Sequence, residues 1–496
     1  MKVYVNLKKK IGNINPMIYG HFIEHFHRQI YGGIYDPSSR FADEDGFRTD
    51  VLDAMRNIKV PILRWPGGCF VSSYNWKKAV GDKRTPFFDK AWRVEDPNSF
   101  GTDEYVKLCR KIGCEPYICT NAGTGTAEEM SDWVEYCNLK NEGEYAKWRI
   151  ENGYPEPHNV KFWSVGNENW GRHEIGAKDA VEWGRFVEES AKMMLHVDPR
   201  IQLSAAALPN HDWNFNLLKT AGSRLKWISI HDYYDGLWDN YVPSDYATAM
   251  VQTNKLGQSI SKVRGALMML GLNKQIKIAY DEWNLRGWHH PYSHRNLEQG
   301  ADINKLLGAR DKNDTNATYT TADSVFTACF LNECIRNCDI VGMANFAPIV
   351  NTTGAIFTHQ DGIVKRSTYY VVEVMTKHMG DRALDIYEED ATVESVNRES
   401  IKMVDVAAAE RSRDGAITIS AINKHDSEER DVELEIDHDA IDRKHVTVYT
   451  VNGASKDSFN DIGNEQVSVS SCEYKVNGNN IRILLAPHSV NMVVIK

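Results

Sequence analysis

Two glutamates that directly follow short apolar runs are the residues of this sequence best suited to chemistry. Glu168 lies in the segment SVGNENWG and Glu282 in AYDEWN, and each is flanked by asparagine and tryptophan. A single glutamate at the end of a strand is most often a solvated loop residue. Two opposed carboxylates can cleave a glycosidic bond, because one protonates the leaving oxygen while the other attacks or stabilises the sugar carbon.

Other polar residues follow the apolar runs in the same way. They are Glu24, Arg64, Cys69, Asn121, Asn167, His231 and Tyr233. A metal site among His21, His25 and His27 is one alternative, but the sequence has no HExxH helix, and packing histidines in a pocket wall are favoured. A nucleophilic Cys69 is another alternative. No base is paired with it in the sequence, so a thiol that lines the pocket is favoured.

The elements that must hold these residues recur eight times along the chain. The apolar runs are short and mostly not strictly alternating, as expected of strands buried on both faces of a parallel sheet. They cover residues 17–24, 60–65, 115–122, 160–168, 201–208, 225–234, 276–284 and 340–350.

Segments with helical periodicity separate these runs, among them 47–58, 179–197 and 244–270. The pattern predicts a (β/α)₈ barrel over residues 16–380, with catalytic groups at the carboxyl ends of its strands. An open doubly wound sheet is the competing arrangement. Its dinucleotide fingerprint is absent, since Gly123-Thr-Gly125 lacks the third glycine.

The pattern changes after about residue 380. Alternating or β-branched runs, separated by Asn, Gly, Asp and Ser, cover residues 416–425, 431–437, 445–453, 481–486 and 489–496. This spacing predicts an antiparallel, jelly-roll-like β-sandwich. The opening run KVYVNL also alternates, so we expect residues 1–15 and 381–496 to form this second domain together.

Composition excludes several classes of protein. Of the 496 residues, 58 are Lys or Arg and 68 are Asp or Glu, and the net charge of −10 argues against a nucleic-acid binder. No apolar stretch approaches the roughly 20 residues of a membrane span, and no signal peptide is evident. Nine cysteines without framework spacing predict reduced thiols in a cytoplasmic protein. The 13 Trp and 22 Tyr suit sugar faces, but they suit a protein core equally well.

Several long segments resemble glycoside hydrolase family 51, the α-L-arabinofuranosidases. Besides GNEN at 166–169 and DEWN at 281–284, they are GHFIEHFHRQIYGGIYD (20–36), RWPGGCFVSSYNW (64–76), FGTDEYVKLCRKIGCEPYICTNAGTGTAEEMSDWVEYCN (100–138) and DGIVKRSTYYV (361–371). The resemblance covers nearly the whole chain. In the C-terminal part it depends mainly on position and on the closing APHSVNMVVI.

The resemblance implies a role for each matching residue. Glu168 would be the general acid/base and Glu282 the nucleophile of a retaining double displacement. Asn167 would hydrogen-bond the sugar 2-hydroxyl. Arg64 would lie beside Glu282, and His231 would support the same network.

The remaining site residues would form the walls of the sugar pocket. The resemblance implies that Glu24, Cys69 and Tyr233 line it around a terminal arabinofuranose. We expect Trp288, in the loop after Glu282, to be a stacking platform on the leaving-group side. No metal and no cofactor is expected.

One stretch departs from the family pattern. Many relatives carry a Gln after the eighth strand that reaches the sugar, whereas ANFAPIVNTTG places Pro348 there. Proline has no side-chain donor, so we expect this contact to be absent or to come from a neighbour such as Asn351.

The sequence therefore predicts a retaining exo-α-L-arabinofuranosidase that trims terminal arabinose from oligosaccharides. Two alternatives remain: another retaining activity of the superfamily, such as a β-xylosidase or an endo-glucanase, and a non-catalytic carbohydrate-binding protein. The resemblance also suggests a homo-oligomer, often a hexamer, that binds neither nucleic acid nor membrane.

Overall fold

Each of the eight predicted apolar runs coincides with one strand of a single parallel sheet, although two of the strands extend two or three residues beyond their runs. The structure is a computed structural model, and it describes residues 1–237, 242–287, 314–436, 445–475 and 480–496. The strands are β2 (Gly20–Phe22), β3 (Ile62–Trp65), β6 (Glu115–Thr120), β7 (Phe162–Val165), β8 (Gln202–Ala205), β9 (Trp227–Gly236), β10 (Lys277–Gly287) and β11 (Val341–Phe346).

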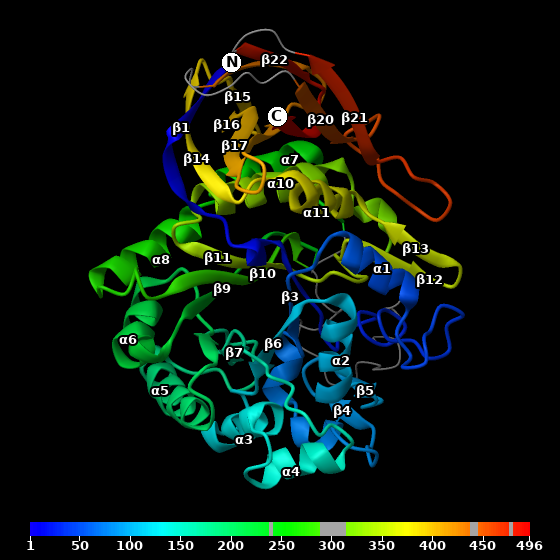
Figure 1. Cartoon of the computed structure of the whole chain (residues 1–496), viewed down its shortest axis with the longest axis vertical. Helices are drawn as coiled ribbons and strands as arrows, with labels where there is room; N and C mark the ends of the chain where they lie inside the picture. The colour runs from blue at the N-terminus through cyan, green and yellow to red at the C-terminus, as the bar shows by residue number, and fades with distance from the viewer. Residues whose placement is uncertain (238–241, 288–313, 437–444, 476–479) are drawn as a thin grey trace.

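The sheet closes into a barrel. Its strand order is β8-β7-β6-β3-β2-β11-β10-β9, so that neighbours along the chain are neighbours in the sheet. The two end strands also meet, because Ala206 bridges Ser229 in parallel, Ala207 N donates to Ser229 O at 2.9 Å, and Lys226 N donates to Leu203 O at 3.0 Å. The predicted (β/α)₈ barrel is confirmed (Figure 1).

Helices cover the outside of the barrel and connect its strands. They are α1 (Thr49–Asn57), α2 (Thr102–Ile112), α3 (Ala127–Asn138), α4 (Glu144–Glu151), α5 (Ala180–Val197), α6 (His211–Ala221), α7 (Tyr246–Val251), α8 (Gln258–Met269), α10 (Thr321–Arg336) and α11 (Ser367–His378). Side-chain caps begin several of them. Asp179, for example, accepts hydrogen bonds from the backbone of Val181 and Glu182 at the start of α5.

Shorter elements fill the connections. The 3₁₀ helices are η1 (Pro16–Tyr19), η2 (Cys69–Ser73), η3 (Trp76–Ala79), η4 (Gly222–Arg224), η5 (Gln252–Lys255) and η6 (Asn316–Thr318). Three antiparallel hairpins pair β4 (Phe87–Asp89) with β5 (Val94–Asp96), β12 (Ile356–His359) with β13 (Gly362–Lys365), and β15 (Val393–Val396) with β16 (Glu399–Lys402).

The second part of the chain forms a nine-stranded sheet with the order β21-β20-β23-β18-β17-β14-β1-β19-β22. Its strands are β1 (Lys2–Asn13), β14 (Arg382–Glu389), β17 (Val404–Arg411), β18 (Ala416–Asn423), β19 (Arg430–Ile436), β20 (His445–Asn452), β21 (Ser468–Lys475), β22 (Asn480–Leu485) and β23 (Ser489–Ile495). All its pairings are antiparallel except one, since β1 runs parallel to β19.

Both faces of this sheet contribute to a hydrophobic core, although side chains such as Tyr387 and Leu484 remain exposed. One face encloses a core of its own, to which Val406, Ile419 and Val493 contribute. Ala407, Ala409 and other residues of the opposite face belong to the large core of the barrel. Between the barrel and this sheet lie α10 and α11 (Figure 1), and α10 is buried almost all round. No helix among the described residues is long and apolar enough to cross a membrane.

Candidate active site

The strand ends bring the two glutamates together. Glu168 follows β7, whereas Glu282 lies on β10, and His231 of β9 stands between them. One carboxylate oxygen of each glutamate and a ring nitrogen of His231 all lie within 4.8 Å of one another. The structure thus brings the two carboxylates together at the carboxyl end of the barrel, where catalytic groups of this fold are found.

A turn after β7 aims the side chain of Glu168. Gly166 has a φ of 70°, and a Cβ there would lie 2.1 Å from Asn169 Oδ1, so only glycine fits. Glu168 itself has a φ of 45°, in the left-handed region that costs a non-glycine residue about 1–2 kcal/mol. Local strain of this kind is common where a side chain must be held at a functional site.

Two histidines hold the carboxylate of Glu168. Oε1 lies 2.7 Å from His231 Nδ1, and Oε2 lies 2.8 Å from His173 Nε2. Burial alone would raise the pKa of Glu168, but the hydrogen bonds to His173 and His231 lower it below its ordinary value. The carboxylate and the two imidazoles therefore form one hydrogen-bonded group that can share a proton.

Glu282 is held by two donors from other strands. Arg64 Nη1 donates to Oε1 at 2.6 Å, and the Tyr233 hydroxyl donates to Oε2 at 2.8 Å. Both oxygens are thereby oriented, and the guanidinium offsets the charge of the carboxylate. Such fixed donors suit a carboxylate that must attack from one defined position.

Arg64 is fully buried and connects several groups of the site. Its Nη2 donates to Asn167 Oδ1 at 2.8 Å and lies 3.6 Å from Cys119 Sγ. Its Nε lies 3.4 Å from Asp281 Oδ2. The same guanidinium thus positions Glu282 and the asparagine that precedes Glu168, which ties the ends of β3, β7 and β10 together.

His231 faces three carboxylates. Its Nε2 lies 3.2 Å from Asp281 Oδ1, while its Nδ1 lies 2.7 Å from Glu168 and 3.6 Å from Glu282 Oε2. Burial by itself would lower the pKa of His231, but Glu282, Asp281 and Glu168 raise it well above the ordinary value. The charged imidazolium is therefore favoured at this position.

Glu24 and Cys69 lie on the side of β2 and β3. Glu24 Oε1 accepts hydrogen bonds from Phe70 N at 3.0 Å and from Trp92 Nε1 at 2.8 Å. Burial, together with the charge of Glu282, raises the pKa of Glu24 well above its ordinary value. Burial and the neighbouring Glu174 likewise raise the pKa of the Cys69 thiol. An uncharged thiol is a poor nucleophile, which favours a pocket-lining role.

Three residues of the site were missed at the sequence level. Asp281 accepts hydrogen bonds from Ser229 Oγ at 2.5 Å and from Tyr117 OH at 2.8 Å, and it orients His231. The sequence feature that could have identified Asp281 is its position next to Glu282 in DEWN. The other two, His173 and Glu174, follow the acid/base candidate in NENWGRHEIG, and only the path of this loop reveals that they turn back toward it.

Two residues that the sequence suggested for the site, Asn121 and Asn351, make structural hydrogen bonds instead. Asn121 caps its own loop, since its Oδ1 accepts from Gly123 N and Thr124 N. Asn351 is fully buried, and its Nδ2 donates to Arg28 O at 2.6 Å and to Thr358 Oγ1 at 2.9 Å. It is therefore committed to structure and does not replace the contact that Pro348 lacks. Trp288 lies outside the described residues.

The three early histidines do not converge on one point. Among the described residues, no group of potential metal ligands includes His21, His25 or His27. His25 Nδ1 instead lies 2.9 Å from Asp96 Oδ2, and its ring stacks on Phe70 at 4.2 Å. These contacts support the interpretation of packing histidines.

Protonation of His21 is expected to destabilise the fold in acid. The side chain is 1% exposed, no described residue hydrogen-bonds its ring nitrogens, and burial lowers its pKa to about 3. The unfolded chain, with an ordinary histidine pKa of about 6.5, binds more protons between these values. The free energy of unfolding should therefore fall as the pH drops below 6.5, by about 2 kcal/mol at pH 5 from this residue alone.

Thermal unfolding from pH 7 to pH 4 tests this prediction. His21→Leu should lose less stability than the wild type over that range, while the exposed His445→Leu should behave as the wild type does. Equal acid sensitivity of His21→Leu and the wild type would show that His21 does not carry the effect.

Loss of the Tyr233 hydroxyl is expected to slow turnover. Tyr233→Phe keeps the ring but removes the 2.8 Å hydrogen bond to Glu282. A hydrogen bond to a charged group contributes about 1.5–3 kcal/mol, so kcat should fall about 10- to 100-fold. The matched control is Tyr234→Phe, because the Tyr234 hydroxyl donates to Asp232 Oδ2 at 3.3 Å and not to Glu282, while its ring packs against Phe326 of α10. Equal kcat values in both variants would contradict the assignment of Tyr233.

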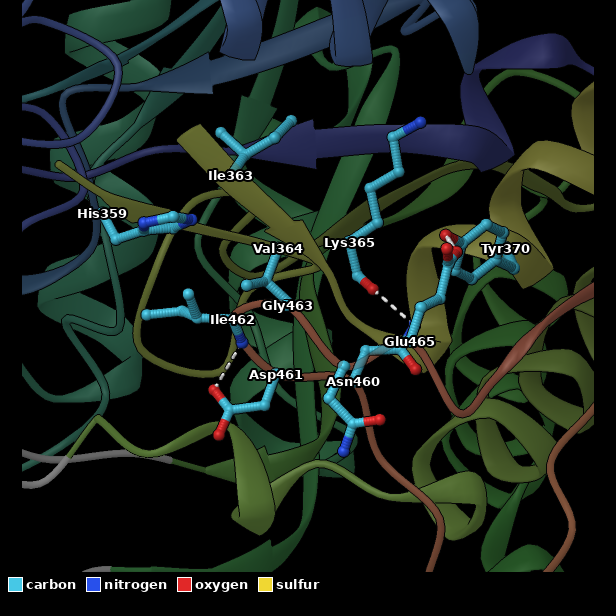
Figure 2. Close-up of a pocket in the computed structure, with 11 residues that line it drawn as sticks. His359, Ile363, Val364, Lys365, Tyr370, Asn460, Asp461, Ile462, Gly463 and Glu465 are labelled. Carbon is cyan, nitrogen blue, oxygen red and sulfur yellow. Dashed lines mark hydrogen bonds between the residues drawn. The ribbon is translucent and has the colours of Figure 1, made fainter. Parts of the chain in front are cut away.

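A cavity of about 440 Å³ lies away from the two glutamates, between the β12–β13 hairpin, α11 and residues 460–465 (Figure 2). Its polar groups are largely paired with one another. Asn460 Nδ2 donates to Lys365 O at 2.9 Å, Ile462 N donates to Asp461 Oδ1 at 2.9 Å, and Tyr370 donates to Glu465. Its two carboxylates, Asp461 and Glu465, are thus already engaged by Ile462 N and Tyr370.

Two family models match most of the chain. Residues 54–249 match the model described as "Alpha-L-arabinofuranosidase 1 domain", and residues 281–489 match "Alpha-L-arabinofuranosidase C-terminal domain". The first model thus includes the turn that carries Glu168, and the second begins at Asp281, next to Glu282.

Similar proteins match over nearly the full length of the chain. A probable alpha-L-arabinofuranosidase C of Aspergillus clavatus is 31% identical over 96% of this chain and 94% of that protein. An intracellular exo-alpha-(1->5)-L-arabinofuranosidase of Halalkalibacterium halodurans is 32% identical, covering 92% of this chain and 91% of that protein. The structure of a Thermotoga maritima alpha-L-arabinofuranosidase in complex with arabinose, 33% identical, superposes with a TM-score of 0.87 over 99% of both chains.

Proposed function

The chain belongs to glycoside hydrolase family 51, the α-L-arabinofuranosidases, and we propose that it removes terminal α-L-arabinofuranosyl residues from oligosaccharides with net retention of configuration. The observation that carries the proposed mechanism is the spacing of Glu168 and Glu282, whose nearest oxygens lie within 4.8 Å. Retaining glycosidases hold their carboxyl groups about 5–5.5 Å apart, whereas inverting enzymes leave about 6.5–9.5 Å for a water molecule.

In the first step, Glu282 attacks the anomeric carbon and the glycosidic oxygen leaves. Arg64 and Tyr233 hold the two oxygens of Glu282, so that the nucleophile is already oriented when the sugar binds. The leaving oxygen takes its proton from Glu168. That proton is available because Glu168 shares hydrogen bonds of 2.7 and 2.8 Å with two imidazoles.

In the second step, Glu168 acts as a base. It removes a proton from a water molecule, which attacks the glycosyl ester of Glu282 from the face that the leaving group vacated. The sugar is released with its original configuration because two inversions have occurred. The proton returns to the group formed by Glu168, His173 and His231, which restores the starting state.

The sugar itself is recognised by groups around the two carboxylates. We assign Glu24, Cys69 and Asn167 to the pocket, with Asn167 donating to the 2-hydroxyl. Its Nδ2 carries two protons and makes one described hydrogen bond, at 3.3 Å to Glu174, so that a second donor position remains for a sugar oxygen. Hydrogen bonds to the 2-hydroxyl strengthen in the transition state of glycoside cleavage.

The Halalkalibacterium relative is named an exo-alpha-(1->5)-L-arabinofuranosidase, which supports arabino-oligosaccharides as substrates. A panel of aryl glycosides tests this: the arabinofuranoside should be cleaved far faster than the xyloside and glucoside. Proton NMR of the first-formed sugar tests retention. Preferential cleavage of the xyloside would favour a β-xylosidase instead, and an inverted first product would exclude the double displacement.

We further propose that the enzyme is cytoplasmic and acts as a homo-oligomer. The nine cysteines of the chain are all free, as expected of a reducing compartment, and one relative is named intracellular. Light scattering after size-exclusion chromatography measures the oligomeric state directly, and a monomeric mass would refute the homo-oligomer.

A further inference from the structure

Three side chains next to Glu168, the proposed acid/base, offer atoms that could bind a metal ion. Cys69 lies just after β3, and His173 and Glu174 lie in the loop that follows Glu168. The Cys69 sulfur, a ring nitrogen of His173 and one carboxylate oxygen each from Glu168 and Glu174 lie within 4.8 Å of one another. Two separate loops thus supply four potential ligand atoms to one small volume.

Glu174 contributes to this cluster a carboxylate whose oxygens can still accept further bonds. It is 4% exposed, and its Oε2 accepts one hydrogen bond of 3.3 Å from Asn167 Nδ2. Its Oε1 is buried and makes no hydrogen bond of normal geometry within the described residues, although the Ser72 hydroxyl and the Cys69 thiol interact with this carboxylate. A buried carboxylate oxygen with such weak partners favours a bound proton or cation.

The ring of His173 is placed by its own loop. A Cβ on Gly171 would lie 2.3 Å from His173 Cε1, so the ring can lie across this backbone only because residue 171 is glycine. The ring also meets Trp170 edge-on, at 5.8 Å between centroids. Its Nε2 therefore stands 2.8 Å from Glu168 Oε2, in an imidazole–carboxylate pair whose shared proton a cation can replace.

We propose that Cys69, Glu168, His173 and Glu174 form a binding site for Zn²⁺, and that its occupation inhibits the enzyme. Thiolate, imidazole and carboxylate are the ligands that Zn²⁺ takes in proteins, whereas Mg²⁺ and Ca²⁺ prefer oxygen alone. Binding releases the thiol proton of Cys69 and the proton shared by His173 and Glu168 to solvent. The inhibitory effect, unlike the binding, rests on the proposed role of Glu168, which cannot transfer a proton while it binds the metal.

Cobalt spectroscopy tests the binding without reference to activity. Co²⁺ replaces Zn²⁺ in such sites, and a thiolate ligand gives a charge-transfer band in the near ultraviolet. We expect this band in the wild type, its loss when Zn²⁺ is added, and its absence in Cys69→Ser. The matched control is Cys472→Ser, which removes an exposed thiol far from the site and should keep the band. Absence of the band in the wild type, or its survival in Cys69→Ser, would overturn the proposal.

Inhibition kinetics test the consequence. Zn²⁺ should inhibit hydrolysis of the arabinofuranoside, and EDTA should restore the activity in full. Mutation of a group that only supports a metal ligand costs about 10- to 100-fold in affinity, so loss of a ligand itself should raise the inhibitory Zn²⁺ concentration by at least that factor in Cys69→Ser and in Glu174→Gln, measured relative to the activity that each variant retains. The same inhibitory concentration in both variants and the wild type would refute the site. A cobalt band without inhibition would leave the metal site standing and contradict the role of Glu168.

Discussion

Glu282→Ala is expected to lower kcat about 10⁴-fold or more, because it removes the proposed nucleophile that forms the covalent bond to the sugar. Arg64 and Tyr233 would remain in place without a carboxylate to orient. Hydrolysis of an aryl arabinofuranoside under saturating substrate measures the effect. Azide, added as a small nucleophile, should enter the vacated space and yield a glycosyl azide of inverted configuration.

The control for this prediction is Glu156→Ala, which removes an exposed glutamate outside the pocket and should leave kcat unchanged. Melting temperatures of both variants show whether the fold persists. Turnover of a folded Glu282→Ala within tenfold of the wild type would contradict the assignment of the nucleophile.

Glu168→Ala is expected to give a loss that depends on the leaving group. Protonation by a positioned acid contributes about 10²- to 10⁴-fold, so kcat/KM for an oligosaccharide with a poor alkoxide leaving group should fall by that factor. A dinitrophenyl arabinofuranoside needs little protonation, and its kcat/KM should change far less. Its kcat should still fall, because the second step lacks a base and the glycosyl-enzyme accumulates.

Rescue by azide distinguishes the proposed roles of the two glutamates. In Glu168→Ala it should attack the glycosyl-enzyme, raise kcat for the dinitrophenyl substrate, and yield a product of retained configuration. Equal losses for poor and good leaving groups would show that Glu168 is not the acid. His231→Gln serves as a comparison, since it removes a neighbour of Glu168 but leaves the carboxylate, and its loss should depend less on the leaving group.

Much of the barrel could be predicted because its strands are local features of the sequence. All eight apolar runs coincide with a strand, although the first strand is shorter than expected: residues 17–19 of its run belong to a 3₁₀ helix that Asn15 caps. Strands β14, β17 and β21 of the second sheet were not predicted. In β17 the small Ala407 and Ala409 belong to the core shared with the helices, and alanine carries little signal for a strand.

The two glutamates of the candidate site could be predicted for a related reason, since each stands at the end of an apolar run. The groups that hold the two carboxylates in place could not be predicted from the sequence. His173 contacts Glu168 only because the loop turns back over Gly171, and Asp281 orients His231 only because β9 and β10 are neighbours. Asn351, conversely, was a reasonable candidate to contact the sugar until its amide proved to be committed to Arg28 and Thr358.

The sequence by itself determined the barrel strands, the change to a β-rich second part, and the two carboxylates at strand ends, because burial and periodicity are properties of neighbouring residues. The distances between the residues of the candidate site were decided only by the tertiary structure. Arg64 and Glu282 are 218 positions apart and meet at 2.6 Å because the sheet curls until its end strands join. The spacing of Glu168 and Glu282, on which the proposed retaining mechanism depends, is likewise a property of the closed barrel.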